Sequence, residues 1–174
     1  MPAPEITEHP ILGSAHGLGR LYAAAFPDED LRPLLNALLA EETGVVSLVA
    51  WDARAPVGHV AFTLCMEGGG RTVALLGPLA VAPPHQRRGI GRALVEAGCA
   101  RMAELGAARV CVLGDPAYYA RLGFQPEREI AAPYALPDAW REAWQSRALP
   151  GNCAGLAGRL VVPSPWRDPA LWSS

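Results

Sequence analysis

The stretch LAVAPPHQRRGIGRAL, residues 79–94, decides how the rest of this sequence is interpreted. An apolar run ends at two prolines, and a helical pattern starts at once after a turn that contains Gly89 and Gly91. A helix N-terminus offers unpaired N–H groups and the positive end of the helix dipole, and glycines let an anion approach them. Three basic residues add charge: Arg87, Arg88 and Arg92. The turn therefore predicts a phosphate or pyrophosphate site.

The same turn does not fit two other phosphate-binding motifs. A P-loop would continue with Gly-Lys-Ser/Thr, which is absent here. A Rossmann fingerprint would need a third glycine and repeated βαβ units. From the residues alone, the alternative is a capped surface turn whose arginines are only solvated.

Upstream of the turn, the patterns predict two helices followed by an antiparallel meander. Helical spacing runs from Ser14 to Phe26, and a leucine-rich helix follows Asp28–Asp30. Short turns separate three apolar runs, so the strands should be antiparallel. Pro78 cannot donate to a sheet ladder, so the last strand should be irregular near its end. Strands are expected at 5–9, 45–51, 57–66 and 72–81.

Downstream, a helix over about 89–105 should cross over to a parallel strand at 109–113, and a short helix should follow at 116–122. The buried stripe of the long helix is predicted to be Leu94, Gly98, Met102 and Leu105. In the tail, residues 139–149 fit either a helix or a strand at 143–149. A strand is expected at 158–162 and irregular chain at 163–174.

Composition narrows the class of protein. With 174 residues, of which 51% are apolar, the chain can form one domain with a real core. A net charge of −2 argues against a general nucleic-acid binder, and no apolar run is long enough to span a membrane. The four histidines lack metal-ligand spacing, so no metal is expected. The cysteines are expected to be buried free thiols, and without a signal peptide pattern the protein is expected in the cytoplasm.

Two motifs resemble the GNAT N-acetyltransferases. The strand end Leu79-x-Val81 followed by Gln86–Gly91 is similar to that family's acetyl-CoA signature, [QR]-x-x-G-x-[GA] at the start of a helix. YARLGF, residues 119–124, is similar to its second hallmark, a Tyr four residues before Gly-Phe. The longer VLGDPAYYARLGF resembles the YhbS-type bacterial branch. The resemblance covers about residues 5–130 well and the tail loosely.

This resemblance implies an α/β fold, a mixed α+β sheet in a single N-acetyltransferase domain over 1–174, with 131–174 as C-terminal strands and tail. It implies that the sheet opens beside the third meander strand, that pantetheine enters there, and that the pyrophosphate lies on the amides of 87–92. Backbone groups of Leu79 and Val81 would bind the acetyl carbonyl and the pantetheine amides. The implied coenzyme-binding residues are Leu79, Ala80, Val81, Gln86, Arg87, Arg88, Gly89, Ile90, Gly91 and Arg92.

For acetyl transfer, the resemblance implies that Tyr119 protonates the leaving thiolate. A backbone N–H near Val81 could polarise the carbonyl. The sequence does not identify the general base that deprotonates the amine, because the strand at 72–81 carries no acidic residue. A water chain or an amine that arrives neutral would also serve. The side chains that remain candidates are His59, Glu41, Glu42, Glu67 and His85. For His59, a hydrogen-bonded structural role is the alternative, and for the tail tryptophans the alternative to a substrate pocket is core packing.

The function expected is therefore acetyl transfer from acetyl-CoA to a primary amine of a small molecule or of a protein or peptide. The alternatives are a catalytically weak acyl-CoA sensor or interaction module on the same fold and a plain structural domain. A homodimer is compatible with this reading, although the sequence does not derive it.

Overall fold

The computed structural model describes residues 3–8 and 15–173. The chain divides into two compact units, of which the first comprises residues up to Phe62 together with Gly77–Gly98. The second comprises Thr63–Leu76 and the chain from Cys99 onward. Residue 9 of the expected first strand and residue 14 at the start of the expected first helix lie outside the described residues. The single-domain expectation stays a prediction.

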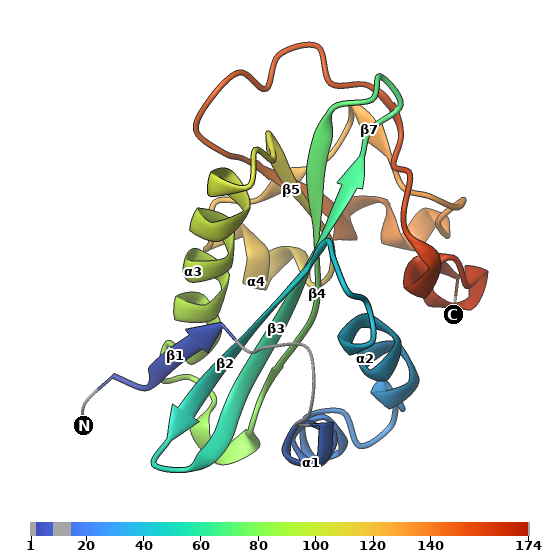
Figure 1. Cartoon of the computed structure of the whole chain (residues 1–174). Helices are drawn as coiled ribbons and strands as arrows, with labels where there is room; N and C mark the ends of the chain where they lie inside the picture. Colours follow the sequence, from blue (N-terminus) through green and yellow to red (C-terminus); the bar gives the residue numbers. More distant parts are fainter. Residues whose placement is uncertain (1–2, 9–14, 174) are drawn as a thin grey trace. The chain divides into compact units, whose positions relative to one another are not determined.

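The first unit contains an antiparallel arrangement and two helices, α1 (Ala15–Ala25) and α2 (Arg32–Leu39). Strand β1 (Glu5–Glu8) pairs antiparallel with β2 (Val45–Asp52), from Glu5 opposite Trp51 to Glu8 opposite Leu48. The sheet continues with β3 (Ala55–Met66) and then β4 (Thr72–Val81), of which residues 55–62 and 77–81 belong to the first unit. The two-residue connection between β2 and β3 makes a hairpin, as expected. Figure 1 shows this succession of strands.

The core of the first unit joins both helices to the strands. Leu18, Leu21 and Tyr22 of α1 pack with Leu35 of α2, and strand residues complete the cluster. Residues 45–50 of β2 are all buried, which suits a strand covered on both faces. The apolar periodicity thus predicted these elements because each one hides a continuous apolar surface.

The end of β4 is irregular, as Pro78 predicted. The peptide bond between Gly77 and Pro78 is cis. A short 3-10 helix (Pro83–His85) follows the strand, and α3 (Ile90–Glu104) begins five residues later. In the first unit α3 packs closely on β3, since a Cβ on Gly98 would lie 1.9 Å from the Phe62 ring.

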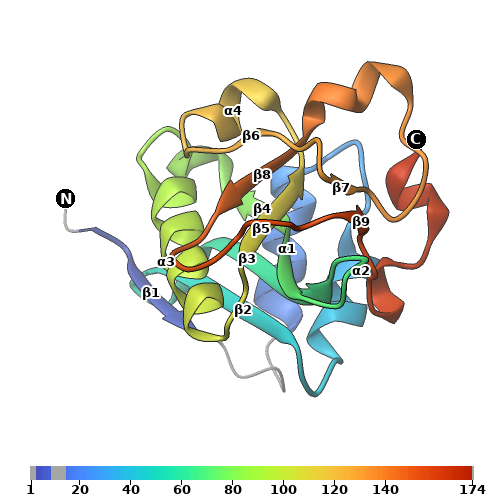
Figure 2. The same cartoon turned by 90° about the horizontal axis from the view of Figure 1, so that it is seen from above.

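The second unit contains the parallel pair that the crossover predicted. Residues 74–76 of β4 pair parallel with 110–112 of β5 (Arg109–Leu113). On its other side β5 pairs antiparallel with β8 (Trp144–Ala148), which in turn pairs with β6 (Gln125–Pro126). A separate pair joins β7 (Ile130–Ala131) to β9 (Gly158–Arg159). In the sheet β5 thus lies between β4 and β8, and Figure 2 draws these strands seen from above. The mixed α/β fold class is confirmed.

The structure decides between the helix and the strand that the sequence allowed in residues 139–149. Residues 138–143 form a 3-10 helix and the strand β8 follows directly, so the strand reading is the better one. Three of the four tail tryptophans form a core cluster, with Trp144 and Trp166 each 5.9 Å from Trp172 between ring centroids, whereas Trp140 is half-buried. Each indole N–H group of the cluster donates a hydrogen bond within the second unit. These three pack the interior, as the safer reading expected.

Four details of the predicted structure were wrong. Leu105, the first residue after α3, is 38% exposed instead of buried. The strand expected at 158–162 is paired as β9 only over two residues, and Val161 then forms an isolated bridge with Met66. Residues 164–166 and 169–172 are 3-10 helices instead of irregular chain. Cys153 is half-buried, whereas the other three cysteines are buried free thiols.

Candidate active site

The turn before α3 has the backbone shape of an anion site. Arg87 and Gly89 both adopt positive φ, 61° and 81°. Alternation of this kind turns successive N–H groups toward one side, which favours anions. The helix ladder starts with Ala93 N–H donating to the Gly89 carbonyl at 3.0 Å. At the start of a helix the first N–H groups precede the carbonyls that accept within the helix, so this end of α3 is suited to an anion.

Charge and exposure at this turn agree with that shape. The side chains of Gln86, Arg87, Arg88 and Arg92 are exposed, and so is Gly89. Ile90 and Gly91 are buried and anchor the start of the helix. A Cβ on Gly58 of β3 would lie 2.9 Å from Ile90, so the helix start lies directly against the strand. The turn thus presents cations and amides on a rigid support.

Hydrogen bonds tie the turn to the ends of the strands. The Gln86 side-chain amide donates to the Val81 carbonyl at 3.1 Å, and the Ala82 N–H donates to the Val57 carbonyl at 2.8 Å. The His85 ring contacts Asp52 at 3.1 Å between Nε2 and Oδ2. In the structure, then, the side chain of Gln86 holds the turn against β4. Of the remaining predicted backbone positions, Ala80 is buried, and Leu79 and Val81 are half-buried.

Tyr119 lies on the short helix α4 (Pro116–Ala120) of the second unit. Asp115 caps that helix by accepting the Ala117 N–H at 2.9 Å. The Tyr119 ring is 8% exposed and packs edge-on against Phe124, with ring centroids 5.5 Å apart. A Cβ on Gly114 would lie 2.5 Å from the ring, so glycine at that position makes room for it.

Burial raises the pKa of Tyr119 well above the ordinary value for a phenol, and the neighbouring Tyr118 contributes further. The phenol is therefore protonated throughout the neutral range. Burial keeps the proton available and does not by itself favour its release. Tyr118 is half-buried and packs edge-on against Tyr119, with ring centroids 5.0 Å apart.

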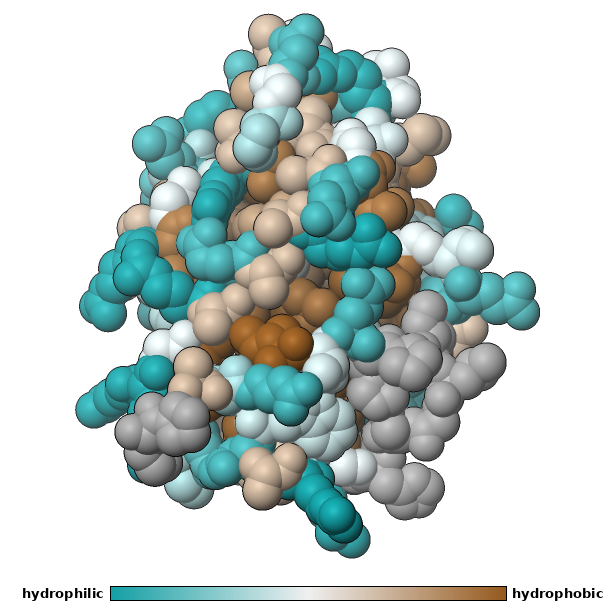
Figure 3. All heavy atoms as spheres, turned by 60° about the vertical axis from the view of Figure 1, so that its left-hand side comes forward, coloured by the Kyte–Doolittle hydropathy of each residue, from teal (hydrophilic) through white to brown (hydrophobic). Residues whose placement is uncertain are grey.

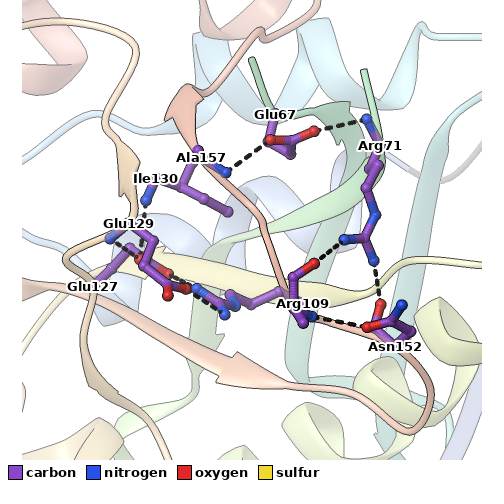
Figure 4. Close-up of polar contacts among 9 residues, drawn as sticks. Glu67, Arg71, Arg109, Glu127, Glu129, Ile130, Asn152 and Ala157 are labelled. Atoms are coloured by element: carbon purple, nitrogen blue, oxygen red, sulfur yellow. Dashed lines mark hydrogen bonds and ion pairs between the residues drawn. The ribbon is translucent and has the colours of Figure 1, made fainter. Parts of the chain in front are cut away.

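Glu67 is not available as a base. Its carboxylate is 2% exposed and accepts the N–H groups of Arg71 and Ala157, both at 2.9 Å. Hydrogen bonds from Ala157, Arg71 and Gly69 hold the pKa of Glu67 below its ordinary value. Figure 4 shows Glu67 facing these partners in the second unit. The carboxylate fixes the turn between β3 and β4 against the tail, which is a structural task.

His59 is also engaged in the interior. It is 0% exposed, and its two ring nitrogens lie 2.7 Å from the hydroxyls of Tyr22 and Ser47. His85 has one ring nitrogen near Asp52, and its Nδ1 is buried without a hydrogen-bond partner among residues 3–8 and 15–173. Glu41 is partly exposed and Glu42 exposed, just after α2. None of these positions by itself identifies the base.

Sequence reasoning missed an ionic cluster in the second unit. The Arg109 guanidinium contacts the carboxylates of Glu127 and Glu129, each at 2.8 Å (Figure 4). Burial alone would raise the pKa of Glu127, but hydrogen bonds from Ser146, Ile130 and Glu129 outweigh it and lower that pKa. No motif could have revealed the cluster, because Arg109 and Glu127 are 18 positions apart.

The comparisons with known proteins decide the family. The model of the acetyltransferase (GNAT) family matches residues 15–124, a segment that contains both the turn and Tyr119. The chain belongs to the GNAT family. As a member it is an acyltransferase of the N-acetyltransferase class.

Two Escherichia coli K12 relatives agree with the expected branch. The uncharacterized N-acetyltransferase YjhQ is 32% identical over 157 residues, covering 87% of this chain and 81% of YjhQ. The uncharacterized N-acetyltransferase YhbS is 34% identical over 128 residues, covering 72% of this chain and 74% of YhbS. The YhbS-type resemblance is thereby confirmed.

Solved structures agree as well. A crystal structure of YhbS from E. coli in complex with CoA has a TM-score of 0.84 at 26% identity and covers 97% of this chain and 94% of that one. A GNAT acetyltransferase from Brucella melitensis in complex with acetyl-CoA has a TM-score of 0.73 at 26% identity. It covers 93% of this chain and 97% of that one. Both confirm the GNAT fold.

No helix within the described residues is long and apolar enough to cross a membrane. On the face drawn in Figure 3, hydrophilic residues interrupt the apolar areas. Among the described residues, no group of three or more His, Cys, Asp or Glu side chains is placed to hold a metal ion.

Proposed function

We propose that this protein transfers the acetyl group of acetyl-CoA directly to a primary amine of a small molecule or of a protein or peptide. The observation that carries the proposal is the turn before α3, where positive φ at Arg87 and Gly89 coincides with the N-terminus of a long helix. The relatives crystallised with CoA and with acetyl-CoA share this fold and support the choice of coenzyme.

In this proposal the diphosphate of the coenzyme lies on the N–H groups of residues 87–92. Arg87, Arg88 and Arg92 are exposed and add full positive charges beside those amides. Gln86 acts through its hydrogen bond to Val81, which holds the turn in place. Backbone groups of Leu79 and Val81 bind the acetyl carbonyl and the pantetheine amides.

The chemistry proposed needs an electrophile, a neutral amine and a proton for the leaving thiolate. A backbone N–H at the end of β4 polarises the thioester carbonyl, a contribution of about 3 kcal/mol in comparable sites. The amine attacks, the C–S bond breaks, and Tyr119 gives its proton to the thiolate. The amine arrives neutral or gives its ammonium proton to water, and after the attack its nitrogen releases a further proton to water, since Glu67 and His59 are both engaged elsewhere.

The hydrogen bonds that occupy Glu67 and His59 also favour a second function. A protein that keeps the coenzyme turn but cannot use Glu67 or His59 as a base could serve as an acyl-CoA sensor. The two functions differ in thiol release. An acetyltransferase releases CoA thiol and yields an acetylated product with some member of a broad amine panel, detected by mass. A sensor binds acetyl-CoA in a calorimetric titration and releases no thiol with any amine.

A further inference from the structure

A chain of hydrogen bonds runs through the interior of the first unit and ends on the backbone of β4. The Ser47 hydroxyl lies 2.7 Å from His59 Nε2, and His59 Nδ1 lies 2.7 Å from the Tyr22 hydroxyl. Tyr22 in turn donates to the Pro78 carbonyl at 3.2 Å. The three side chains are at most 1% exposed, so solvent does not compete for these bonds. They come from β2, β3 and α1.

The carbonyl at the end of the chain fixes the direction of the protons. Because a carbonyl only accepts, we assign the single Tyr22 hydroxyl hydrogen to the bond with Pro78. The Tyr22 oxygen then accepts from His59 Nδ1–H. A neutral His59 carries its hydrogen on Nδ1, and its Nε2 accepts the Ser47 hydroxyl hydrogen. Every link in the chain is satisfied with an uncharged ring, and such chains strengthen one another.

This series of hydrogen bonds ends at Pro78, a position that backbone bonds of the sheet hold weakly. Pro78 has no backbone N–H and cannot be fixed through one. The bond from Tyr22 holds the Pro78 carbonyl instead. The Pro78–Leu79 peptide bond is trans, so its C=O and N–H point in opposite directions. Fixing the Pro78 carbonyl toward Tyr22 therefore fixes the Leu79 N–H on the opposite side of the peptide.

We infer that Ser47, His59 and Tyr22 are positioning residues that orient the Leu79 N–H for the coenzyme. The inference rests on the proposed function, in which Leu79 is one of the backbone groups that bind the acetylated end of acetyl-CoA. It assigns His59 a task in catalysis without proton transfer to substrate. It also explains why a core of leucine and valine contains three buried polar side chains in contact.

The test compares Tyr22→Phe with a matched control, Phe26→Leu. Tyr22→Phe keeps the ring and removes only the hydroxyl, whereas Phe26→Leu disturbs the ring that stacks on Tyr22 at 6.0 Å and leaves the chain intact. We expect Tyr22→Phe to raise the Kd for acetyl-CoA about fivefold to tenfold, because a loosened amide binds its acceptor less well. The control should stay within twofold of the unmodified protein.

A second readout does not depend on coenzyme binding. In ligand-free protein labelled with ¹⁵N-leucine, Tyr22→Phe should shift the Leu79 amide resonance, and Phe26→Leu should leave it nearly in place. Ser47→Ala removes the far end of the chain and should give a smaller change of the same kind. It also serves if Tyr22→Phe does not fold.

The outcomes separate this inference from the proposed function. If the unmodified protein binds acetyl-CoA and both Tyr22→Phe and Ser47→Ala leave its Kd and the Leu79 resonance unchanged, the positioning role is wrong and the proposed function stands. If the unmodified protein binds neither CoA nor acetyl-CoA, the proposed function fails and the coenzyme role of Leu79 fails with it.

Discussion

Gly89→Ala is the substitution that separates binding of the coenzyme from stability of the fold. Gly89 has φ +81°, and a Cβ built on it would meet nothing within 4 Å. The methyl group therefore causes no clash in the ligand-free protein. It does force alanine into the left-handed region, at a cost of about 1–2 kcal/mol. It also places bulk where the diphosphate is proposed to approach the amides.

Gly44→Ala is the matched control, because Gly44 also has φ +81° and open space around a built Cβ. Both variants should therefore lose similar stability, with Tm falling about 2–4 °C for each kcal/mol in a chain of this size. Only Gly89→Ala should also weaken CoA binding. If the methyl group disrupts one charge-assisted hydrogen bond worth about 1.5–3 kcal/mol, Kd rises roughly tenfold to a hundredfold.

Thermal unfolding and calorimetric titration with CoA measure the two effects. The reasoning is refuted if Gly89→Ala and Gly44→Ala bind CoA with Kd values that agree within twofold. A larger loss of stability in Gly89→Ala than in Gly44→Ala would show instead that the turn has a contact that the structure does not contain.

Three further substitutions test other parts of the account. Tyr119→Phe should lower the rate of acetyl transfer at least tenfold with little change in CoA affinity, since only the donated proton is lost; an unchanged rate would remove Tyr119 from this role. Glu67→Gln should lower Tm at pH 7, and because the pKa of Glu67 is held below its ordinary value of 4.5, that difference should shrink as pH falls below 4.5; a gap independent of pH would contradict the charged hydrogen bonds. Gly98→Ala should destabilise the fold by about 1–3 kcal/mol through overpacking on Phe62, whereas Gly19→Ala, which has open space in α1, should not; equal Tm values would argue against the close contact of α3 with β3.

The sequence predicted the meander, the crossover helix and the parallel strand well, because each has one clear period and ends at glycine or proline. Leu105 was misplaced because periodicity does not say where a helix stops. The secondary structure of the tail could not be predicted, because its prolines and tryptophans follow no regular spacing. There the fold depends on contacts such as Trp166 with Thr63, which are 103 positions apart.

The candidate site could likewise be predicted from the sequence only in part. The turn at 86–92 could be predicted because its chemistry lies in consecutive residues. The chain from Ser47 through His59 to Tyr22 could not, because its members come from three elements and meet only in the folded protein. The sequence offered His59 as a base or as a structural residue, and only its complete burial favours the second.

The most direct test of the central claim is a crystal structure of the protein with CoA. The account predicts the diphosphate oxygens within hydrogen-bond distance of backbone N–H groups among residues 87–92, with at least one of the three exposed arginines beside them. A complex in which CoA binds elsewhere and leaves these amides to water would contradict it.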